Sequence, residues 1–146
     1  MAHRFTTRVY YEDVDLAGIV YYANYLRFIE RARSEWVREL GLDQRALKAE
    51  GLVFAVRRIE ADYLAPARFD DVIEVTTAPE RVQPARALLL QEVRRGAELL
   101  FAAKVTIVAI GPRERAVRLP PALRAAAPEQ APAEAPGEGA GGKTRA

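Results

Sequence analysis

A single amphipathic stripe dominates the first third of this chain. Apolar residues recur at the three- and four-residue spacing that places them on one face of an α-helix: Tyr25, Phe28, Ile29, Ala32, Trp36, Val37 and Leu40. Arginines and glutamates occupy most of the positions between them. Asn24 is a suitable N-cap, and Gly41 is suited to the left-handed conformation that ends many helices. The pattern therefore predicts one long helix between Asn24 and Gly41, with one apolar face to bury.

The rest of the chain favours strands. Residues 5–12, before the helix, are rich in Thr, Val and Tyr and predict a first strand. A short helical segment is expected at 44–51, and after it the hydrophobic pattern is that of strands. These further strands are 58–63, 70–77 and the two halves of 86–110, which divide at a tight turn at Arg95–Gly96 and end before Pro112.

One strand, one long helix and four strands form an α+β arrangement. A five-stranded antiparallel sheet wrapped around one long central helix would bury the apolar stripe, and this architecture is the hotdog fold. Because the other sheet face or an edge strand commonly binds a second copy, we expect a homo-oligomer, either a dimer or a homotetramer. The folded domain is predicted at 1–126, and 127–146 is predicted to be a disordered Ala/Pro/Gly-rich tail that cannot offset its ordering entropy.

The composition disfavours several classes of function. The chain has 22 Lys and Arg against 20 Asp and Glu, and a net charge of +2 argues little for nucleic-acid binding. It has no apolar run of the roughly 18–20 residues that span a bilayer and no apolar signal segment, so we expect no stable membrane insertion and a cytoplasmic location. There are no cysteines, and His3 is the only histidine. Any chemistry is therefore expected to use carboxylates, hydroxyls, lysine or backbone dipoles, without a metal or other cofactor.

Three acidic residues lie close together where the first strand is expected to end, in the stretch YEDVDLAGIVYYANY (11–25). Acids are common in turns because their side chains accept backbone hydrogen bonds, and this interpretation is favoured for Glu12 and Asp13. Asp15 differs because small and apolar residues follow it. Gly18 allows a backbone path closed to other residues, and lets a ligand come close.

The residues after Asp15 lead into the start of the predicted long helix. The first N–H groups of a helix have no intrahelical partners and lie at the positive end of its dipole. A carboxylate just upstream can attack a carbonyl carbon or activate water, while those N–H groups receive the developing oxyanion. Local chemistry alone leaves a purely structural turn as the alternative for Asp15.

The stretch YYEDVDLAGIVYYANYLRFIERARSEWVRELG resembles the signature of the 4-hydroxybenzoyl-CoA thioesterase family, most closely its Tol–Pal-associated acyl-CoA thioesterase branch. The matching features are D-x-D-x-x-G followed by apolar residues and N-Y, and then Glu-Arg-Ala-Arg (30–33) within the helix. The similarity extends over about residues 5–123. It implies a hotdog enzyme that hydrolyses an acyl-CoA to a carboxylic acid and CoA.

The resemblance also implies roles for particular residues. The second aspartate of the motif corresponds to Asp15, which would act as nucleophile or as general base. The backbone N–H of Tyr22 would polarise the thioester oxygen, in a site formed between two subunits. Many members of the acyl-CoA branch have histidine at the position of Tyr22, so this chain retains the backbone role and lacks any contribution of an imidazole.

Basic side chains are expected at the mouth of such a site because CoA carries phosphates. The candidate substrate-binding residues are Gly18, Arg57, Arg58 and Arg86, and the alternative for each arginine is an ordinary solvated surface position. Arg68 is instead predicted to form structural ion pairs with Asp70 or Asp71.

Three other functions stay open at this point. The acyl group could be aromatic, of the 4-hydroxybenzoyl type, or the thiol carrier could be an acyl carrier protein. From a different class, the chain could be a non-catalytic hotdog scaffold of a cell-envelope or lipid-synthesis complex. A carboxylate in an apolar loop, at Asp15, argues against a pure scaffold.

Overall fold

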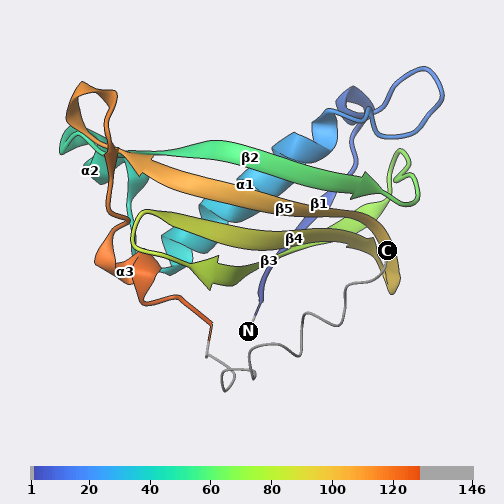
Figure 1. Cartoon of the computed structure of the whole chain (residues 1–146). Coiled ribbons are helices and arrows are strands. Elements are labelled where there is room, and N and C mark those ends of the chain that lie inside the picture. The colour runs from blue at the N-terminus through green and yellow to red at the C-terminus, as the bar shows by residue number, and fades with distance from the viewer. Residues whose placement is uncertain (1, 129–146) are drawn as a thin grey trace, which may run out of the picture.

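Helix α1 (Asn24–Glu39) lies against one face of an antiparallel sheet (Figure 1). The computed structural model describes residues 2–128. The sheet order is β1-β3-β4-β5-β2, and the short β6 pairs with the end of β5. The strands are β1 (His3–Arg8), β2 (Val53–Tyr63), β3 (Val72–Val82), β4 (Arg86–Arg95), β5 (Glu98–Ile110) and β6 (Ala116–Val117). The predicted α+β hotdog arrangement is confirmed, with β6 as an addition to the five expected strands.

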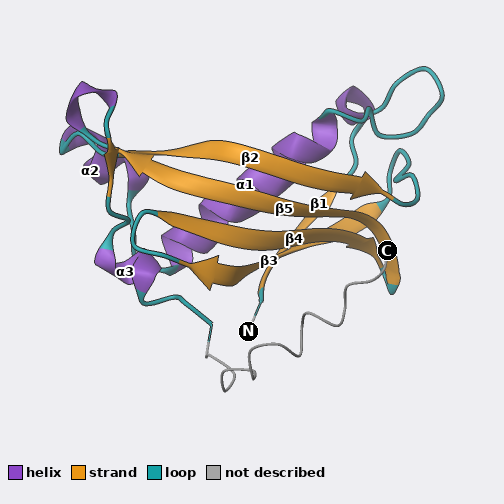
Figure 2. Ribbon diagram, viewed as in Figure 1, coloured by secondary structure: helices purple, strands orange, loops and turns teal. Residues whose placement is uncertain are grey.

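The shorter helical segments flank this sheet (Figure 2). They are the 3₁₀ turns η1 (Tyr11–Asp13) and η2 (Pro112–Glu114) and the helices α2 (Gln44–Ala49) and α3 (Pro121–Arg124). Figure 2 shows α2 and α3 at one end of the sheet, while the loop between β1 and α1 projects from the other end. Within residues 2–128, no helix combines the length and apolarity needed to cross a bilayer.

The apolar stripe of α1 supplies the centre of the core, as predicted. Phe28, Ile29 and Ala32 have no exposed surface, and Trp36 is only 4% exposed. They pack against buried residues of the inner sheet face: Ile73, Val75, Leu89, Val93, Phe101 and Val105. Burial of each large apolar side chain contributes about 1.5–3 kcal/mol, so the stripe fixes how α1 lies on the sheet.

The first strand is shorter than the pattern predicted. It ends at Arg8, and the following residues turn into η1 instead of continuing to residue 12. The Asp13 carboxylate accepts a hydrogen bond from the Tyr10 N–H at 2.8 Å, which stabilises this turn. The predicted N-cap at Asn24 is also wrong, because Ala23 occupies that position and Asn24 is the first helical residue.

Two later strands are longer than predicted. β3 runs past Pro79 to Val82, and a register shift between Pro79 and Arg81 accommodates the proline, which cannot donate to the sheet. β2 begins at Val53, and its register shifts around Arg57. The turn at Gly96 and the end of β5 before Pro112 are confirmed.

The chain beyond β5 adds elements that the pattern did not predict. Leu119 and Leu123, on either side of the start of α3, are buried and extend the core. The predicted tail at 127–146 lies, except for residues 127 and 128, outside the described residues. The division into a domain at 1–126 and a tail therefore stays a prediction.

Candidate active site

Asp15 lies in a small hairpin of residues 14–20, which projects from one end of the sheet as the blue loop between β1 and α1 (Figure 1). The Asp15 N–H donates to the Ile19 carbonyl at 3.0 Å, and the Gly18 N–H donates to the Asp15 carbonyl at 2.9 Å. Gly18 adopts φ +81°, which closes the turn at little steric cost. The Asp15 Oδ1 accepts the Ala17 N–H at 2.8 Å, and the side chain is exposed. The loop thus holds Asp15 in one orientation while leaving it open to solvent.

The base of the hairpin is fixed by Asp13, which is only 4% exposed. Its Oδ1 accepts the side-chain amide of Asn24 at 2.8 Å, and its Oδ2 accepts the Tyr10 N–H at 2.8 Å. Its carbonyl accepts the Tyr21 N–H at 3.0 Å. The predicted bracing role of Asp13 is confirmed, and the bond to Asn24 ties the hairpin to the first residue of α1.

Tyr22 lies between the hairpin and α1. Its backbone N–H donates to no acceptor among residues 2–128. Its carbonyl accepts a hydrogen bond from the Tyr63 hydroxyl at 2.9 Å, which fixes the peptide that follows Tyr22 against the end of β2. A free N–H at the start of a 16-residue helix lies in the positive field of the helix dipole and can bind a developing negative charge.

An apolar pocket of about 310 Å³ opens beside Tyr22. It is lined by Ile19, Val20, Tyr22, Tyr25, Tyr63, Leu64, Ala65 and Pro66. Burial raises the pKa of Tyr63 above its usual value, and the neighbouring Tyr22 adds to this shift. Burial also raises the pKa of Tyr25, against an opposing hydrogen bond from the Ala67 N–H to its hydroxyl. Both phenols are therefore neutral at physiological pH, and the pocket is suited to an uncharged group.

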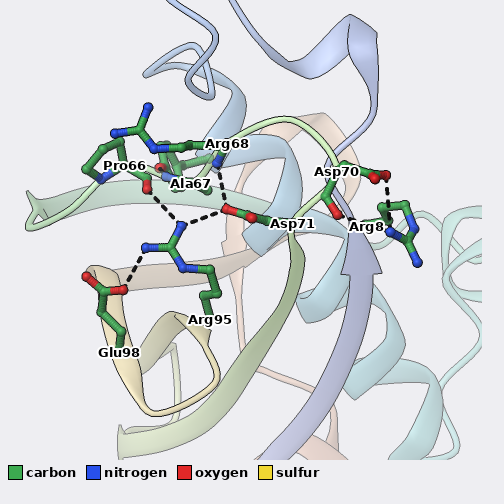
Figure 3. Close-up of polar contacts among 9 residues, drawn as sticks. Arg8, Pro66, Ala67, Arg68, Asp70, Asp71, Arg95 and Glu98 are labelled. Carbon is green, nitrogen blue, oxygen red and sulfur yellow. Dashed lines mark hydrogen bonds and ion pairs between the residues drawn. The ribbon is translucent and has the colours of Figure 1, made fainter.

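Residues 64–71, the β2–β3 loop, lie beside this hairpin and carry two ion pairs (Figure 3). Asp70 pairs with Arg8 and Asp71 pairs with Arg95, so the predicted pairing of these acids with the Arg68 side chain is wrong. Arg68 instead donates its backbone N–H to the Asp71 carboxylate at 2.8 Å.

The predicted CoA-binding arginines lie away from the hairpin within one chain. Arg57 and Arg58 are exposed near the middle of β2, and Arg58 pairs with Glu60. Arg86 begins β4 and donates to Gln83. Arg95, at the other end of β4, contacts the β2–β3 loop. Because β4 has 10 residues and a strand rises about 3.3 Å per residue, Arg86 lies about 30 Å from the end of the sheet that carries this loop. One chain therefore places Asp15 and Gly18 in the hairpin with Tyr22 directly after it, and does not bring the three arginines to them.

His3 lies at the end of β1 away from the hairpin. It pairs with Thr77 on β3, and Arg8 at the other end of β1 contacts the β2–β3 loop. Among the described residues, no three His, Asp or Glu side chains are grouped as metal ligands would be. Sequence reasoning did not identify Tyr63 or the residues at 64–66. They follow Tyr22 by about forty residues, and no local pattern distinguishes them from other strand-end residues.

Comparison with known proteins identifies the family. The model of the thioesterase-like superfamily matches residues 9–127. The acyl-CoA thioester hydrolase YbgC of Escherichia coli O6:H1 is 40% identical over 110 residues, covering 75% of this chain and 82% of the relative. The 1,4-dihydroxy-2-naphthoyl-CoA hydrolase of Thermosynechococcus vestitus is 30% identical over 129 residues, covering 84% of this chain and 88% of the relative.

A solved structure gives the same result. The crystal structure of a probable thioesterase from Bartonella henselae superposes with a TM-score of 0.79 at 38% identity, covering 82% of this chain and all of that one. The similarity in sequence and fold therefore shows that the chain belongs to the thioesterase-like superfamily, as a hotdog protein homologous to the acyl-CoA thioesterases.

Proposed function

We propose that Asp15 and the backbone N–H of Tyr22 carry out the acyl-CoA thioester hydrolysis that membership of this family gives the chain. One observation carries the assignment. The hairpin that presents the exposed Asp15 carboxylate returns directly to Tyr22, whose N–H has no acceptor among the described residues 2–128 and lies at the positive end of α1. These are the two parts that acyl transfer needs, a carboxylate and an oxyanion donor.

Two routes fit this pair of groups. As a nucleophile, the Asp15 carboxylate adds to the thioester carbonyl, the CoA thiolate leaves, and water hydrolyses the resulting anhydride. As a general base, Asp15 takes a proton from water as the water attacks the carbonyl, and the thiolate leaves and is protonated. In both routes the Tyr22 N–H binds the oxyanion of the tetrahedral intermediate. The net reaction is acyl-S-CoA plus water to a carboxylic acid and CoA.

The acyl group is proposed to occupy the apolar pocket beside Tyr22. The pocket is lined by three tyrosines, and burial raises the pKa of Tyr25 and Tyr63 among them, which supports a neutral acyl group. Aromatic rings of this kind accept both an alkyl chain and a flat aromatic ring. An aromatic acyl group, or an acyl carrier protein as thiol carrier, is therefore the second candidate within the same chemistry.

The proposal includes a site shared between two copies of the chain. β2 is an edge strand of 11 residues with exposed Val53 and Val56, and such an edge pairs readily with another strand. Arg57 and Arg58 lie on this strand, so a second copy could bring basic side chains near the hairpin for the CoA phosphates. A homodimer or homotetramer, and a cytoplasmic location, belong to the proposal as predictions of the sequence.

The test is release of free thiol from a panel of short, long and aromatic acyl-CoAs, comparing wild type with Asp15→Asn. An asparagine Oδ1 still accepts the Ala17 N–H, so the hairpin is retained while the carboxylate is lost. We expect a loss of about 10²–10⁴-fold in kcat at unchanged circular dichroism. Glu12→Gln, at an exposed acid three residues away, is the matched control and should keep wild-type activity.

Two results would contradict the proposal. Equal cleavage by wild type and Asp15→Asn removes Asp15 from the mechanism. If the wild type cleaves no acyl-CoA, the substrate is an acyl carrier protein or the chain is the non-catalytic scaffold. Thiol release from an acylated carrier protein then distinguishes these two alternatives.

A further inference from the structure

Arg95, the last residue of β4, contacts two residues of the β2–β3 loop and the first residue of β5 (Figure 3). Its Nη1 donates to the Asp71 Oδ2 at 2.6 Å and to the Pro66 carbonyl at 3.2 Å, and its Nη2 donates to the Glu98 Oε1 at 2.6 Å. The same Asp71 oxygen accepts the Arg68 N–H at 2.8 Å. One guanidinium and one carboxylate thus hold the two ends of the turn at 66–71 against the end of β4.

The β2–β3 loop that they hold is in turn the partner of the hairpin. The Val20 N–H donates to the Ala67 carbonyl at 2.8 Å, and Ile19 forms a β-bridge with Arg68. The Ala67 N–H donates to the hydroxyl of Tyr25 on α1 at 3.0 Å, and Ala67 is fully buried. The returning limb of the hairpin, which leads to Tyr22, is therefore hydrogen-bonded to the loop that Arg95 and Asp71 fix.

We propose that Arg95 and Asp71 are positioning residues for the thioesterase site, although neither lies in it. By fixing the β2–β3 loop they fix the Ile19–Val20 limb of the hairpin, and through that limb the relation of Asp15 to the Tyr22 N–H. The inference rests on the proposed function for its effect on catalysis. Its structural part, the coupling of the ion pair to the hairpin, is independent of any activity.

The physical basis is that neither the loop nor the hairpin has the support of a regular helix or long strand. Segments of this kind open locally at a free energy below that of global unfolding, so a few tertiary hydrogen bonds determine how ordered they are. The Arg95–Asp71 contact is a short charge-assisted bond between half-buried side chains, which is among the stronger polar contacts available. Misplacement of a reacting group by about 1 Å can cost about 10²-fold in rate, so a small shift of the limb matters.

The neighbouring ion pair provides a matched control. Asp70, on the same loop, pairs with Arg8 of β1 at 3.1 Å, but both side chains are largely exposed and neither forms a hydrogen bond or ion pair with residues 66–68. Asp70 has φ +76°, a conformation that asparagine adopts more readily than most residues. Asp70→Asn therefore makes the same chemical change one residue away without touching the proposed coupling.

The experiment compares wild type, D71N, R95K and D70N by two measurements. The first is amide hydrogen exchange of Val20 and Ala67, followed by NMR in the free protein. In D71N and R95K we expect these two amides to exchange at least about tenfold faster while amides at the centre of β4 and β5 keep their protection, because only the local opening is eased. D70N should exchange like wild type.

The second measurement is acyl-CoA hydrolysis. We expect D71N to lower kcat about 10- to 100-fold because the reacting groups shift, and to raise KM by a smaller factor because Ile19, Val20 and Pro66 also line the acyl pocket. R95K should fall between wild type and D71N because lysine keeps the charge but cannot bond Asp71 and Glu98 together as the fork does. The double variant D71N/R95K should lose less than the two single effects combined, because both substitutions weaken the Arg95–Asp71 bond while R95K also alters the bonds to Pro66 and Glu98.

The outcomes separate this inference from the proposed function. Unchanged exchange at Val20 in both D71N and R95K overturns the coupling, whatever the activity. Faster exchange with unchanged kcat leaves the coupling in place and overturns the positioning role. Lack of hydrolysis by wild type contradicts the proposed function alone, and the exchange measurement still decides the coupling. If D71N unfolds, R95K carries the same comparison with a smaller perturbation.

Discussion

The side-chain amide of Asn24 donates to the buried carboxylate of Asp13 at 2.8 Å, so the first residue of α1 holds the base of the hairpin that carries Asp15. Because Asp13 also accepts the Tyr10 N–H at 2.8 Å, one carboxylate joins the end of β1, the hairpin and the helix start. The structure thus gives different tasks to the two aspartates of the motif. Asp13 is buried and uses one oxygen for the Tyr10 N–H and the other for the Asn24 side chain, whereas Asp15 is exposed and uses one oxygen to hold its own turn.

Removal of the Asp13 carboxylate is expected to destabilise the fold. Asp13→Ala leaves the part-buried Tyr10 N–H and the buried Asn24 amide without this acceptor, and a buried group left unsatisfied costs about 1–3 kcal/mol. The urea midpoint should fall accordingly. Glu12→Ala, at an exposed site next in the sequence, should change the free energy of unfolding by less than about 0.5 kcal/mol. Similar midpoints for the two variants would show that the Asp13 bonds contribute little.

Substitution of two turn glycines can distinguish the effect of backbone strain on stability from the effect of substrate contact on KM. Gly18 and Gly96 have φ values of +81° and +61°, and a Cβ at either would meet no atom within 4 Å. Gly18→Ala and Gly96→Ala should therefore each cost about 1–2 kcal/mol of stability through the left-handed conformation alone. Only Gly18→Ala should also raise KM for acyl-CoA, because Gly18 lies in the hairpin next to Asp15. Equal kinetics of the two variants would place the substrate away from Gly18.

The Asp71 carboxylate should give the protein a component of stability that is lost in acid. Burial alone would raise the pKa of Asp71, but hydrogen bonds from the Arg68 N–H and Arg95, with the charges of both arginines, outweigh it and hold the pKa below its usual value. A carboxyl whose pKa is lower in the folded state stabilises fully above its unfolded pKa of about 3.9 and loses this contribution as pH falls through the folded value.

The measurement is urea unfolding of wild type and D71N between pH 7 and pH 2.5. The difference in free energy of unfolding between wild type and D71N should be constant from pH 7 to about pH 5 and should shrink below about pH 4. A stability difference that persists unchanged in acid, or that shrinks already near neutral pH, would be inconsistent with a lowered pKa at Asp71.

The free edge of β2 provides a test of the proposed oligomer. Val56 on β2 is 44% exposed, and a lysine there places charge on an edge that would otherwise pair with a second copy. Val56→Lys should weaken dimerisation by at least about tenfold, or about 1.4 kcal/mol, in sedimentation equilibrium. Val72→Lys, at a valine that is 48% exposed on β3, is the matched control and should assemble like wild type. A monomeric wild type, or equal weakening by both lysines, would exclude β2 as the interface.

Local periodicity was sufficient for the elements that depend on near neighbours in the chain. The stripe of α1 and the turn at Gly96 could be predicted because residues three or four apart on a helix, or two apart on a strand, share a face whatever the rest of the fold does. The distinction between Asp15 and the other acids was visible for the same reason, since small and apolar residues follow it directly. The ends of β1, β2 and β3 were less predictable, because tertiary contacts and register shifts at Arg57 and Pro79 decide where pairing stops.

The sequence by itself determined the helix, most of the strands, the family and the loop that holds the candidate carboxylate. The tertiary structure alone decided what surrounds that loop. The Tyr63 hydroxyl reaches the Tyr22 carbonyl across 41 residues, and the Ala67 N–H reaches Tyr25 across 42. Arg95 pairs with Asp71 where a pairing with Arg68 was expected. Contacts of this length depend on strand order and register, which place the ends of β2 and β4 beside the start of α1 and leave no signal in the residues adjacent to either partner.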